Sequence, residues 1–395
     1  MNKVDNREHK HRTGIESYYI IKNNQRMQFG YTTGTCAAAA TKAATRMLLT
    51  GENVDYVKLT TPKGISLNLE VVDTTIDENL VTCGIIKDAG DDPDATNGIK
   101  VLATVRPTDG DEITICGGVG VGRVTKPGLE QPIGEAAINS VPRKMILESI
   151  EEELKRAGKE RKGIEVTISI PEGVEVAKKT FNPRLGIVGG ISVLGTSGIV
   201  EPMSESALIR SLEVEVKQQI TLGRRYLVVT LGNYGKGYLD NLEEVPLKDS
   251  VKCSNFVGEV IDAAVAYGAE GILFVAHIGK FIKVAGGIMN THSRNSDSRV
   301  EIMASAALRA GISREGAMKI LDSVTTDDGI NYIIEEGVYD RFAEIICEKI
   351  GFYLNNRAYG RIETGAIVFS NVHGLIGKTD SADMLVNKIK DEYKK

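Results

Sequence analysis

The chain of 395 residues is long enough for two domains, and its 42% hydrophobic and 26% charged residues are typical of a globular protein. A net charge of −5 with scattered basic residues argues against nucleic acid as a partner. The five cysteines form no CxxC pair, which disfavours a disulfide framework and a structural zinc site and favours a cytoplasmic location.

Residues 1–26 are polar and include the charged run His9–Arg12. They contain no apolar stretch long enough for a signal sequence or a membrane span. We therefore expect a flexible tail at this end of the chain and no association with a membrane.

The next segment, residues 31–44, reads YTTGTCAAAATKAA and predicts a helix that starts among three threonines and ends near Gly51. Such a start leaves backbone N–H groups unpaired, so it could bind a carboxylate or phosphate beside the hydroxyls of Thr32, Thr33 and Thr35. Ordinary helix capping combined with tight packing is the alternative interpretation.

Residues 27–184 combine helices with short alternating runs, which predicts an α+β domain. Strands are expected within residues 57–72, around a turn, and over residues 113–116 and 164–170. A second amphipathic helix is expected over residues 142–156.

Repeated units of buried strand, loop and amphipathic helix follow residue 185. Such units predict parallel strands covered by helices, so residues 185–395 should form a doubly wound α/β domain. The expected strands are residues 185–192, 226–231, 271–276 and 364–369. The expected helices are residues 205–220, 255–267, 299–310 and 382–390.

Three loops rich in glycine and polar residues follow strands of this second domain, and ligands bind at the carboxyl ends of parallel strands. One loop alone would be ordinary turn chemistry, whereas three at one sheet edge favour a binding cleft. The loops are Gly195–Gly198, Gly232–Gly235 and His277–Lys280.

The third loop opens the most basic part of the chain. Four cationic side chains and one anionic side chain lie between His277 and Arg299, with a second histidine at His292. Such a concentration of donors suits a ligand with many carboxylates. A solvated surface loop is the alternative.

Three further motifs could serve function or could simply be ordinary turns, strands or loops. GGVGVG at residues 117–122 does not give the dinucleotide spacing, and we interpret it as a tight glycine strand or turn. Residues 372–379 resemble a phosphate-binding P-loop, except that Val372 stands where glycine is needed. The acidic residues 88–94 could bind a cation or simply form a loop.

Five blocks in this order resemble the CbiD family, the cobalt-precorrin-5B (C1)-methyltransferases, over nearly the whole chain after residue 26. They are YTTGTCAAAATKAA, KDAGDDPDAT at residues 87–96, GGVGVGRVTKPGL at 117–129, GIVGGISVLGTSGIVEPMS at 186–204 and HIGKFIKVAGGIMNTHS at 277–293. The resemblance implies methyl transfer from S-adenosylmethionine to C1 of cobalt-precorrin-5B, which gives cobalt-precorrin-6A in anaerobic cobalamin biosynthesis. Cobalt would arrive within the substrate, so no protein metal site is expected.

These roles can be assigned to residues as expectations. His292 and His277 are the candidate catalytic groups. The candidate ligands of the corrin precursor are Thr32, Thr33, Thr35, Lys280, Lys283 and Arg294. The candidate ligands of the methyl donor are Gly195, Thr196, Ser197, Gly232, Asn233 and Gly235.

Two other functions stay open on the sequence. One is a nucleotide-phosphate enzyme that uses residues 372–379, and the other is a corrinoid carrier without catalysis. The sequence also leaves open whether the protein forms a homo-oligomer.

Overall fold

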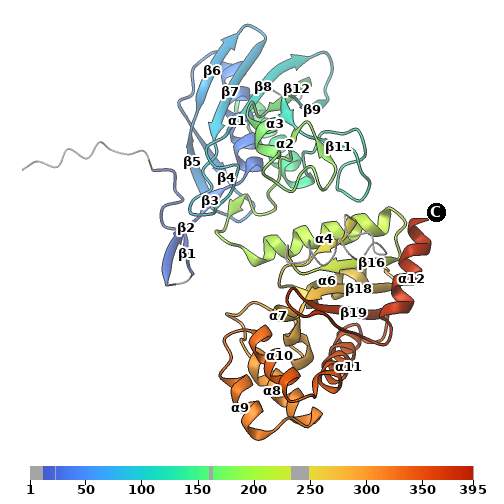
Figure 1. Cartoon of the computed structure of the whole chain (residues 1–395). Helices are drawn as coiled ribbons and strands as arrows, with labels where there is room; N and C mark the ends of the chain where they lie inside the picture. Colours follow the sequence, from blue (N-terminus) through green and yellow to red (C-terminus); the bar gives the residue numbers. More distant parts are fainter. Residues whose placement is uncertain (1–11, 23, 160–162, 233–248, 395) are drawn as a thin grey trace, which may run out of the picture. The chain divides into compact units, whose positions relative to one another are not determined.

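A computed structural model describes residues 12–22, 24–159, 163–232 and 249–394. The chain divides into two compact units, Met1–Ser204 and Glu205–Lys395 (Figure 1). The sequence had suggested that residues 185–204 belong to the second domain. The division instead follows Ser204, so these residues belong to the first unit. No helix in the described ranges is long and apolar enough to cross a membrane.

The first unit begins with an antiparallel hairpin inside the expected tail. Strand β1 (Tyr19–Lys22) pairs with β2 (Gln25–Gln28), with Tyr19 opposite Gln28. The expectation of a flexible tail is therefore wrong for this hairpin, because ladder hydrogen bonds fix its backbone. Residues 1–11 lie outside the described residues.

Helix α1 (Thr33–Thr50) is the alanine-rich helix predicted from the sequence, and it ends at Gly51, whose φ of 72° suits glycine. It packs with α2 (Ser140–Arg156) against a mixed sheet of order β6-β7-β8-β12-β9 (Figure 1). The strands are β6 (Val72–Asp77), β7 (Leu80–Ile86), β8 (Lys100–Thr108), β12 (Gly163–Ser169) and β9 (Ile113–Gly117). The first unit thus mixes helices and strands, as predicted.

Short strand pairs complete this unit. Strands β4 (Tyr56–Thr60) and β5 (Ser66–Glu70) form the predicted hairpin. Three pairs of two-residue strands join segments that are far apart in the chain. These are β3 (Gly30–Tyr31) with β15 (Ile199–Val200), β10 (Gly120–Val121) with β14 (Gly190–Ile191), and β11 (Arg123–Val124) with β13 (Ile187–Val188). The strand expected at residues 185–192 therefore belongs to this unit.

The second unit contains a sheet of order β17-β16-β18-β19-β20. Neighbouring strands are parallel except β20, which is antiparallel to β19. The strands are β16 (Tyr226–Thr230), β17 (Val251–Lys252), β18 (Gly271–His277), β19 (Glu363–Ser370) and β20 (Gly374–Lys378).

Helices cover both faces of this sheet, because alternate strand residues enter two different cores. Leu227 and Phe274 pack in the larger core with α4 (Glu205–Thr221), α6 (Val257–Ala266) and α11 (Tyr339–Arg357). Val228 and Leu273 pack in the smaller core with α12 (Ala382–Tyr393). The predicted parallel strands covered by helices are thus present.

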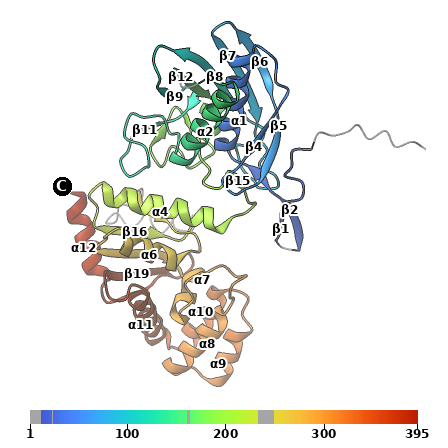
Figure 2. The same ribbon diagram turned by 180° about the vertical axis from the view of Figure 1, so that it is seen from behind.

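The connection from β18 to β19 is largely helical. Its helices are α7 (Ile278–Phe281), the 3₁₀ helix η2 (Ile282–Gly286), α8 (Arg299–Ala310), α9 (Arg314–Leu321) and α10 (Thr326–Glu335), followed by α11. Both views show α8, α9 and α10 packed together (Figure 1, Figure 2).

Candidate functional site

The strand order of the second unit has a switch point at the carboxyl ends of β16 and β18, where a crevice is expected. Strand β16 leads to β17 on one side, whereas β18 leads to β19 on the other side. Ligands of parallel sheets bind where neighbouring strands diverge in this way. Gly232 and His277 stand at the ends of these two strands, and Gly232 has a φ of 72°. Asn233 and Gly235 lie outside the described residues.

The His277 imidazole caps the short helix after β18. Its Nδ1 accepts a hydrogen bond of 3.0 Å from the Gly279 N–H, and its ring stands edge-on to Phe369. Burial lowers the pKa of His277, although the nearby Asp327 carboxylate acts in the opposite direction. The Asn371 N–H also approaches Nε2, at 3.4 Å. A neutral ring accepts at only one nitrogen, so the shorter bond assigns the ring proton to Nε2.

Lys280 links two strand ends at this edge. Its ammonium donates to Oδ1 of Asn255 at 3.2 Å, and Asn255 lies three residues after the end of β17. The backbone N–H of Thr291 donates to the Asn255 carbonyl at 2.9 Å, so the basic loop and the start of α6 are held together. Asn255 was not singled out from the sequence, because a lone asparagine before a helix looks like an ordinary turn residue.

Lys283 anchors the loop from inside. Its side chain is about 3% exposed, and its ammonium donates to the carbonyls of Thr291 at 3.1 Å and Ser296 at 2.7 Å. The Asp297 carboxylate lies 3.7 Å away. Burial lowers the pKa of Lys283, and Asp297 opposes that effect. The ammonium is thus bonded to carbonyls of its own loop, and its predicted binding of the substrate stays a prediction.

His292 and Arg294 lie exposed on the loop that Lys283 anchors. The Arg294 N–H donates to Nδ1 of His292 at 3.1 Å. Arg299 is paired with Asp297 at 2.7 Å, which offsets part of the positive charge counted in the sequence. Ligand roles for Lys280, Lys283, His292 and Arg294 on this loop all stay predictions.

A second polar cluster lies at the end of β19. The buried Ser370 hydroxyl donates to Oδ1 of Asp327 at 2.6 Å and accepts from the Val372 N–H at 2.9 Å. Asp327 belongs to the first turn of α10, which begins with a capping box at Thr325. The cluster thus connects α10 to the end of β19, beside His277. Of these features, only the capping pattern of α10 could have been predicted from the sequence.

The first turn of α6 holds an unusual carboxylate. Oε2 of Glu259 is buried and has no hydrogen-bond partner among the residues that the structure describes. Most buried polar atoms of native proteins are hydrogen-bonded, so such an oxygen calls for an explanation.

In the first unit, the start of α1 is closed by the chain itself. Thr33 Oγ1 accepts from the Leu194 N–H at 3.0 Å, and the Gly34 N–H donates to the Leu194 carbonyl at 3.0 Å. Thr35 Oγ1 donates to the Gly198 carbonyl at 2.6 Å. These bonds fit the capping and packing interpretation, whereas a ligand role for the threonines stays a prediction.

The Gly195–Gly198 loop therefore belongs to the start of α1. Gly195 has a φ of 138°, and a Cβ built on it would lie 2.2 Å from Thr32 Oγ1, so only glycine fits this approach. The Ser197 carbonyl accepts from the Lys63 N–H at 3.1 Å. The prediction that this loop shares a sheet edge with the two others is wrong, because its neighbours are strands of the first unit. Binding of the methyl donor by Gly195, Thr196 and Ser197 stays untested.

The near-P-loop is a hairpin. Residues 374–378 form β20, which pairs antiparallel with β19, and the Thr379 hydroxyl accepts from the Ala366 N–H at 2.8 Å. A P-loop needs a strand, a glycine loop and a helix, so this alternative is wrong.

The glycine segment 117–122 and the acidic loop 88–94 make contacts that fit a structural interpretation. Gly120 is packed so tightly that a Cβ on it would lie 1.8 Å from the Ile170 carbonyl oxygen, which agrees with a tight glycine turn. In the acidic loop, Asp94 pairs with the buried Lys87 at 2.7 Å, and Asp92 accepts from the Met203 N–H at 2.7 Å. The loop carboxylates therefore hold the fold of the first unit.

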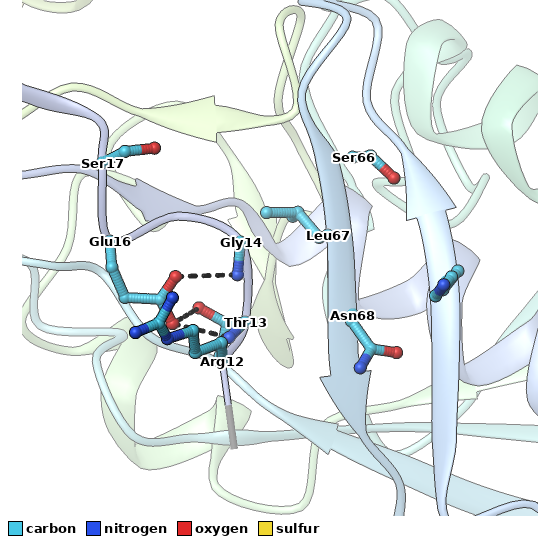
Figure 3. Close-up of a pocket in the computed structure, with 9 residues that line it drawn as sticks. Arg12, Thr13, Gly14, Glu16, Ser17, Ser66, Leu67 and Asn68 are labelled. Atoms are coloured by element: carbon cyan, nitrogen blue, oxygen red, sulfur yellow. Dashed lines mark hydrogen bonds between the residues drawn. The ribbon is translucent and has the colours of Figure 1, made fainter. Parts of the chain in front are cut away.

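A hollow of about 730 Å³ lies elsewhere in the first unit (Figure 3). Its lining consists of residues 12–14, 16, 17, 58 and 66–68. The Glu16 carboxylate in this hollow already accepts from the N–H groups of Thr13 and Gly14. None of the predicted site residues lines it.

Fold and candidate site together define a two-unit protein whose second unit has polar side chains at the carboxyl edge of a mostly parallel sheet. The chain belongs to the CbiD family. The family model described as CbiD matches residues 20–202, and the model described as CbiD, C-terminal domain, matches residues 290–380.

Relatives with one shared name support this membership. The chain is 49% identical over 356 residues to the cobalt-precorrin-5B C(1)-methyltransferase of Ruminiclostridium cellulolyticum, covering 90% of this chain and 92% of that protein. For the enzymes of that name from a Thermoanaerobacter species and Alkaliphilus metalliredigens the identities are 47% and 44%. The alignments cover 91% and 95% of this chain, and 97% and 98% of those proteins.

A crystal structure of a cobalamin biosynthesis protein (cbiD) from Archaeoglobus fulgidus is 28% identical and covers 71% of this chain and 87% of that chain. The TM-score is 0.39, so the overlay is too poor to transfer geometry.

Proposed function

We propose that the protein transfers a methyl group from S-adenosylmethionine to C1 of cobalt-precorrin-5B, giving cobalt-precorrin-6A in anaerobic cobalamin biosynthesis. The observation that carries this proposal is the identity of 44% to 49% with three enzymes of that name over at least 90% of this chain. Five unpaired cysteines favour a cytoplasmic location.

The second unit, a doubly wound α/β domain in this proposal, would hold the reactants at its carboxyl edge. S-adenosylmethionine supplies an electrophilic methyl group, and the corrin precursor brings its own cobalt. The chain then has to orient the two reactants and exclude water, which lowers the barrier to an in-line displacement. Lys280 and Arg294 would bind corrin carboxylates through charge-assisted hydrogen bonds.

Oε2 of Glu259, which has no hydrogen-bond partner among the described residues, bears on whether this part of the second unit suits the methyl donor. A buried acceptor without a donor suits a ligand that brings hydroxyl groups, and it lies in the helix turn that follows β17. Gly232, which follows β16, has a φ of 72° that suits glycine, and we assign it a place beside the methyl donor.

Two histidines serve different parts of the proposal. His292 is exposed, and we assign it the role of proton acceptor, for which it would release the Arg294 N–H from Nδ1. His277 carries its proton on Nε2, so it would donate a hydrogen bond at the crevice and orient a bound group.

The test is a reaction of purified protein with cobalt-precorrin-5B and S-adenosylmethionine. We expect a product heavier by one methyl group, located at C1 by nuclear magnetic resonance with a labelled methyl donor. Methylation at another carbon, or none with substrate that a known family enzyme converts, overturns the proposal. Corrinoid binding without turnover would instead support a carrier.

A further inference from the structure

Asp327 is a half-exposed carboxylate that the protein holds in place without neutralising it. Its Oδ1 accepts from the Ser370 hydroxyl at 2.6 Å. In the ranges that the structure describes, no lysine or arginine forms an ion pair with it. A carboxylate can accept about four hydrogen bonds, so most of the capacity of Asp327 is open to a ligand.

Helix α10, which carries Asp327, does not need this side chain for its cap. The capping box uses Thr325 and Asp328, each of which accepts from the backbone N–H of the other. A negative charge in the first turn suits the helix dipole, but the dipole does not explain why Asp327 is bonded to the end of β19.

Ser370 fixes the orientation of this carboxylate. Its buried hydroxyl accepts from the N–H groups of Val372 at 2.9 Å and His373 at 3.2 Å. Because both of its lone pairs are used, the hydroxyl can only donate, and it donates to Asp327. A second bond joins the same segments, since Nε2 of His373 lies 3.4 Å from the Asp327 carbonyl. The carboxylate is therefore oriented by the chain itself.

Asp327 lies at the carboxyl edge of the second unit. Its carboxylate is within electrostatic reach of His277, whose ring stands against Phe369. Both views show α10 next to α7, the short helix that His277 caps (Figure 1, Figure 2). Strands β16, β18 and β19 are successive neighbours, so the ends of β16 and β19 lie about 10 Å apart. A ligand of the methyl donor's length spans this distance.

The charge of Asp327 selects between the two reactants. A corrin precursor with many carboxylates would be repelled by a further carboxylate. The methyl donor carries a sulfonium and an ammonium group against one carboxylate, so its net charge is positive. Only the ammonium can donate hydrogen bonds to Asp327, because the sulfonium has no N–H or O–H group.

We infer that Asp327 binds the α-ammonium group of S-adenosylmethionine, an inference that rests on the proposed function. The ammonium donates to the carboxylate, which keeps its bond from Ser370. Ser370 is thus a positioning residue, since it acts on the donor only through Asp327. The inference places the amino-acid end of the donor at the ends of β18 and β19, beside His277.

The test compares binding of S-adenosylhomocysteine with binding of its desamino analogue, which lacks only the α-amino group, by titration calorimetry. The wild type should bind the amine about 10- to 100-fold more tightly, because the analogue loses a hydrogen bond to a charged group. Asp327→Asn should lose most of this preference, and Ser370→Ala should lower the affinity for the amine alone. The matched control is Asp340→Asn, at an exposed first-turn aspartate of α11, which should behave as wild type.

Thermal unfolding separates this role from a structural one. Asp327→Asn should melt close to wild type, because its amide oxygen still accepts from Ser370. A purely structural role would weaken binding of both compounds equally and leave the preference intact. The inference is overturned if folded Asp327→Asn keeps the wild-type preference, or if the wild type itself shows none while C1 methylation proceeds. If the wild type binds neither compound and transfers no methyl, the proposed function falls as well.

Discussion

The His277 imidazole connects the end of β18 to the first turn after it, and its environment makes stability depend on pH. Burial lowers its pKa in the folded state, whereas an unfolded chain has a histidine pKa of about 6.5. Between these two values the unfolded state binds more protons. The folded state therefore loses stability as pH falls below about 6.5.

We expect the melting temperature to fall more steeply from about pH 7.5 to about pH 5.5 in the wild type than in His277→Asn. The asparagine oxygen can still accept from the Gly279 N–H but does not titrate in this range. Thermal unfolding followed by circular dichroism at both pH values measures the difference. Equal slopes would show that the His277 proton is not linked to folding.

Lys280 and Lys283 lie three residues apart, yet the structure gives them different roles. Lys283→Met should destabilise the protein by about 2 to 4 kcal/mol, because it removes charge-assisted bonds to the Thr291 and Ser296 carbonyls. Lys280→Gln should keep the melting temperature close to wild type and raise the corrin Michaelis constant. Denaturant unfolding and initial rates separate the two effects. A Lys283→Met variant of wild-type stability would contradict the anchoring role.

At the scale of single elements, helix α1 offers an internal comparison of buried threonines. The Thr35 hydroxyl donates to the Gly198 carbonyl, whereas the buried Thr45 hydroxyl has no hydrogen-bond partner within the described part of the chain. Thr35→Val should lower the free energy of unfolding by about 1 kcal/mol, because the buried Gly198 carbonyl loses one of its two donors and keeps the Thr32 N–H. Thr45→Val should leave it unchanged or raise it.

Urea unfolding of both variants measures these changes under identical conditions. If Thr35→Val is as stable as wild type but binds corrin poorly, the hydroxyl serves a ligand and not the Gly195–Gly198 loop. If both variants lose the same stability, shape rather than hydrogen bonding explains the effect.

Short-range sequence patterns predicted most helices and strands, because periodicity and turn residues act over only a few positions. The expected helix at residues 299–310 coincides with α8, and the hairpin of β4 and β5 follows from its Pro-Lys-Gly turn. The partners of residues 186–200 could not be predicted, because two-residue strands carry no periodicity and pair with distant segments. The same holds for residues 374–378, whose glycine and lysine fit a strand as well as a phosphate loop.

The sequence predicted where some candidate residues lie in the fold, but not which contacts they make. Strand ends marked His277 and Lys280 correctly as neighbours of a sheet edge. Charge alone could not show that Lys283 points into its own loop, since burial depends on how residues 287–298 fold over it. Asn255 and Glu259 carry no motif, and only the hydrogen-bond pattern distinguishes them from ordinary helix-start residues.

At the scale of the whole molecule, the two units have separate hydrophobic cores. One core is built from residues between Ile15 and Ile199, and the largest core of the second unit from residues between Leu212 and Ile376. We expect calorimetry to resolve two unfolding transitions. S-adenosylhomocysteine at about 100 times its dissociation constant should stabilise one of them by about 2.7 kcal/mol.

Hydrogen exchange would assign the stabilised transition, which should belong to Glu205–Lys395. A shift confined to Met1–Ser204 would place the methyl donor at the threonines and the Gly195–Gly198 loop instead. That outcome would contradict the assignment of the donor to the edge of β16 and β17.

The bond from Thr35 to Gly198 spans 163 positions of the chain, and this has a consequence for how the protein is made. On the ribosome, α1 is synthesised early, but the segment that covers its start emerges only much later. At about 5 to 20 residues per second, the interval is roughly 8 to 33 s. Throughout that time the start of the alanine-rich helix is not covered by the segment around Gly198. A nascent chain halted before residue 198 should therefore be a target for chaperones and proteases.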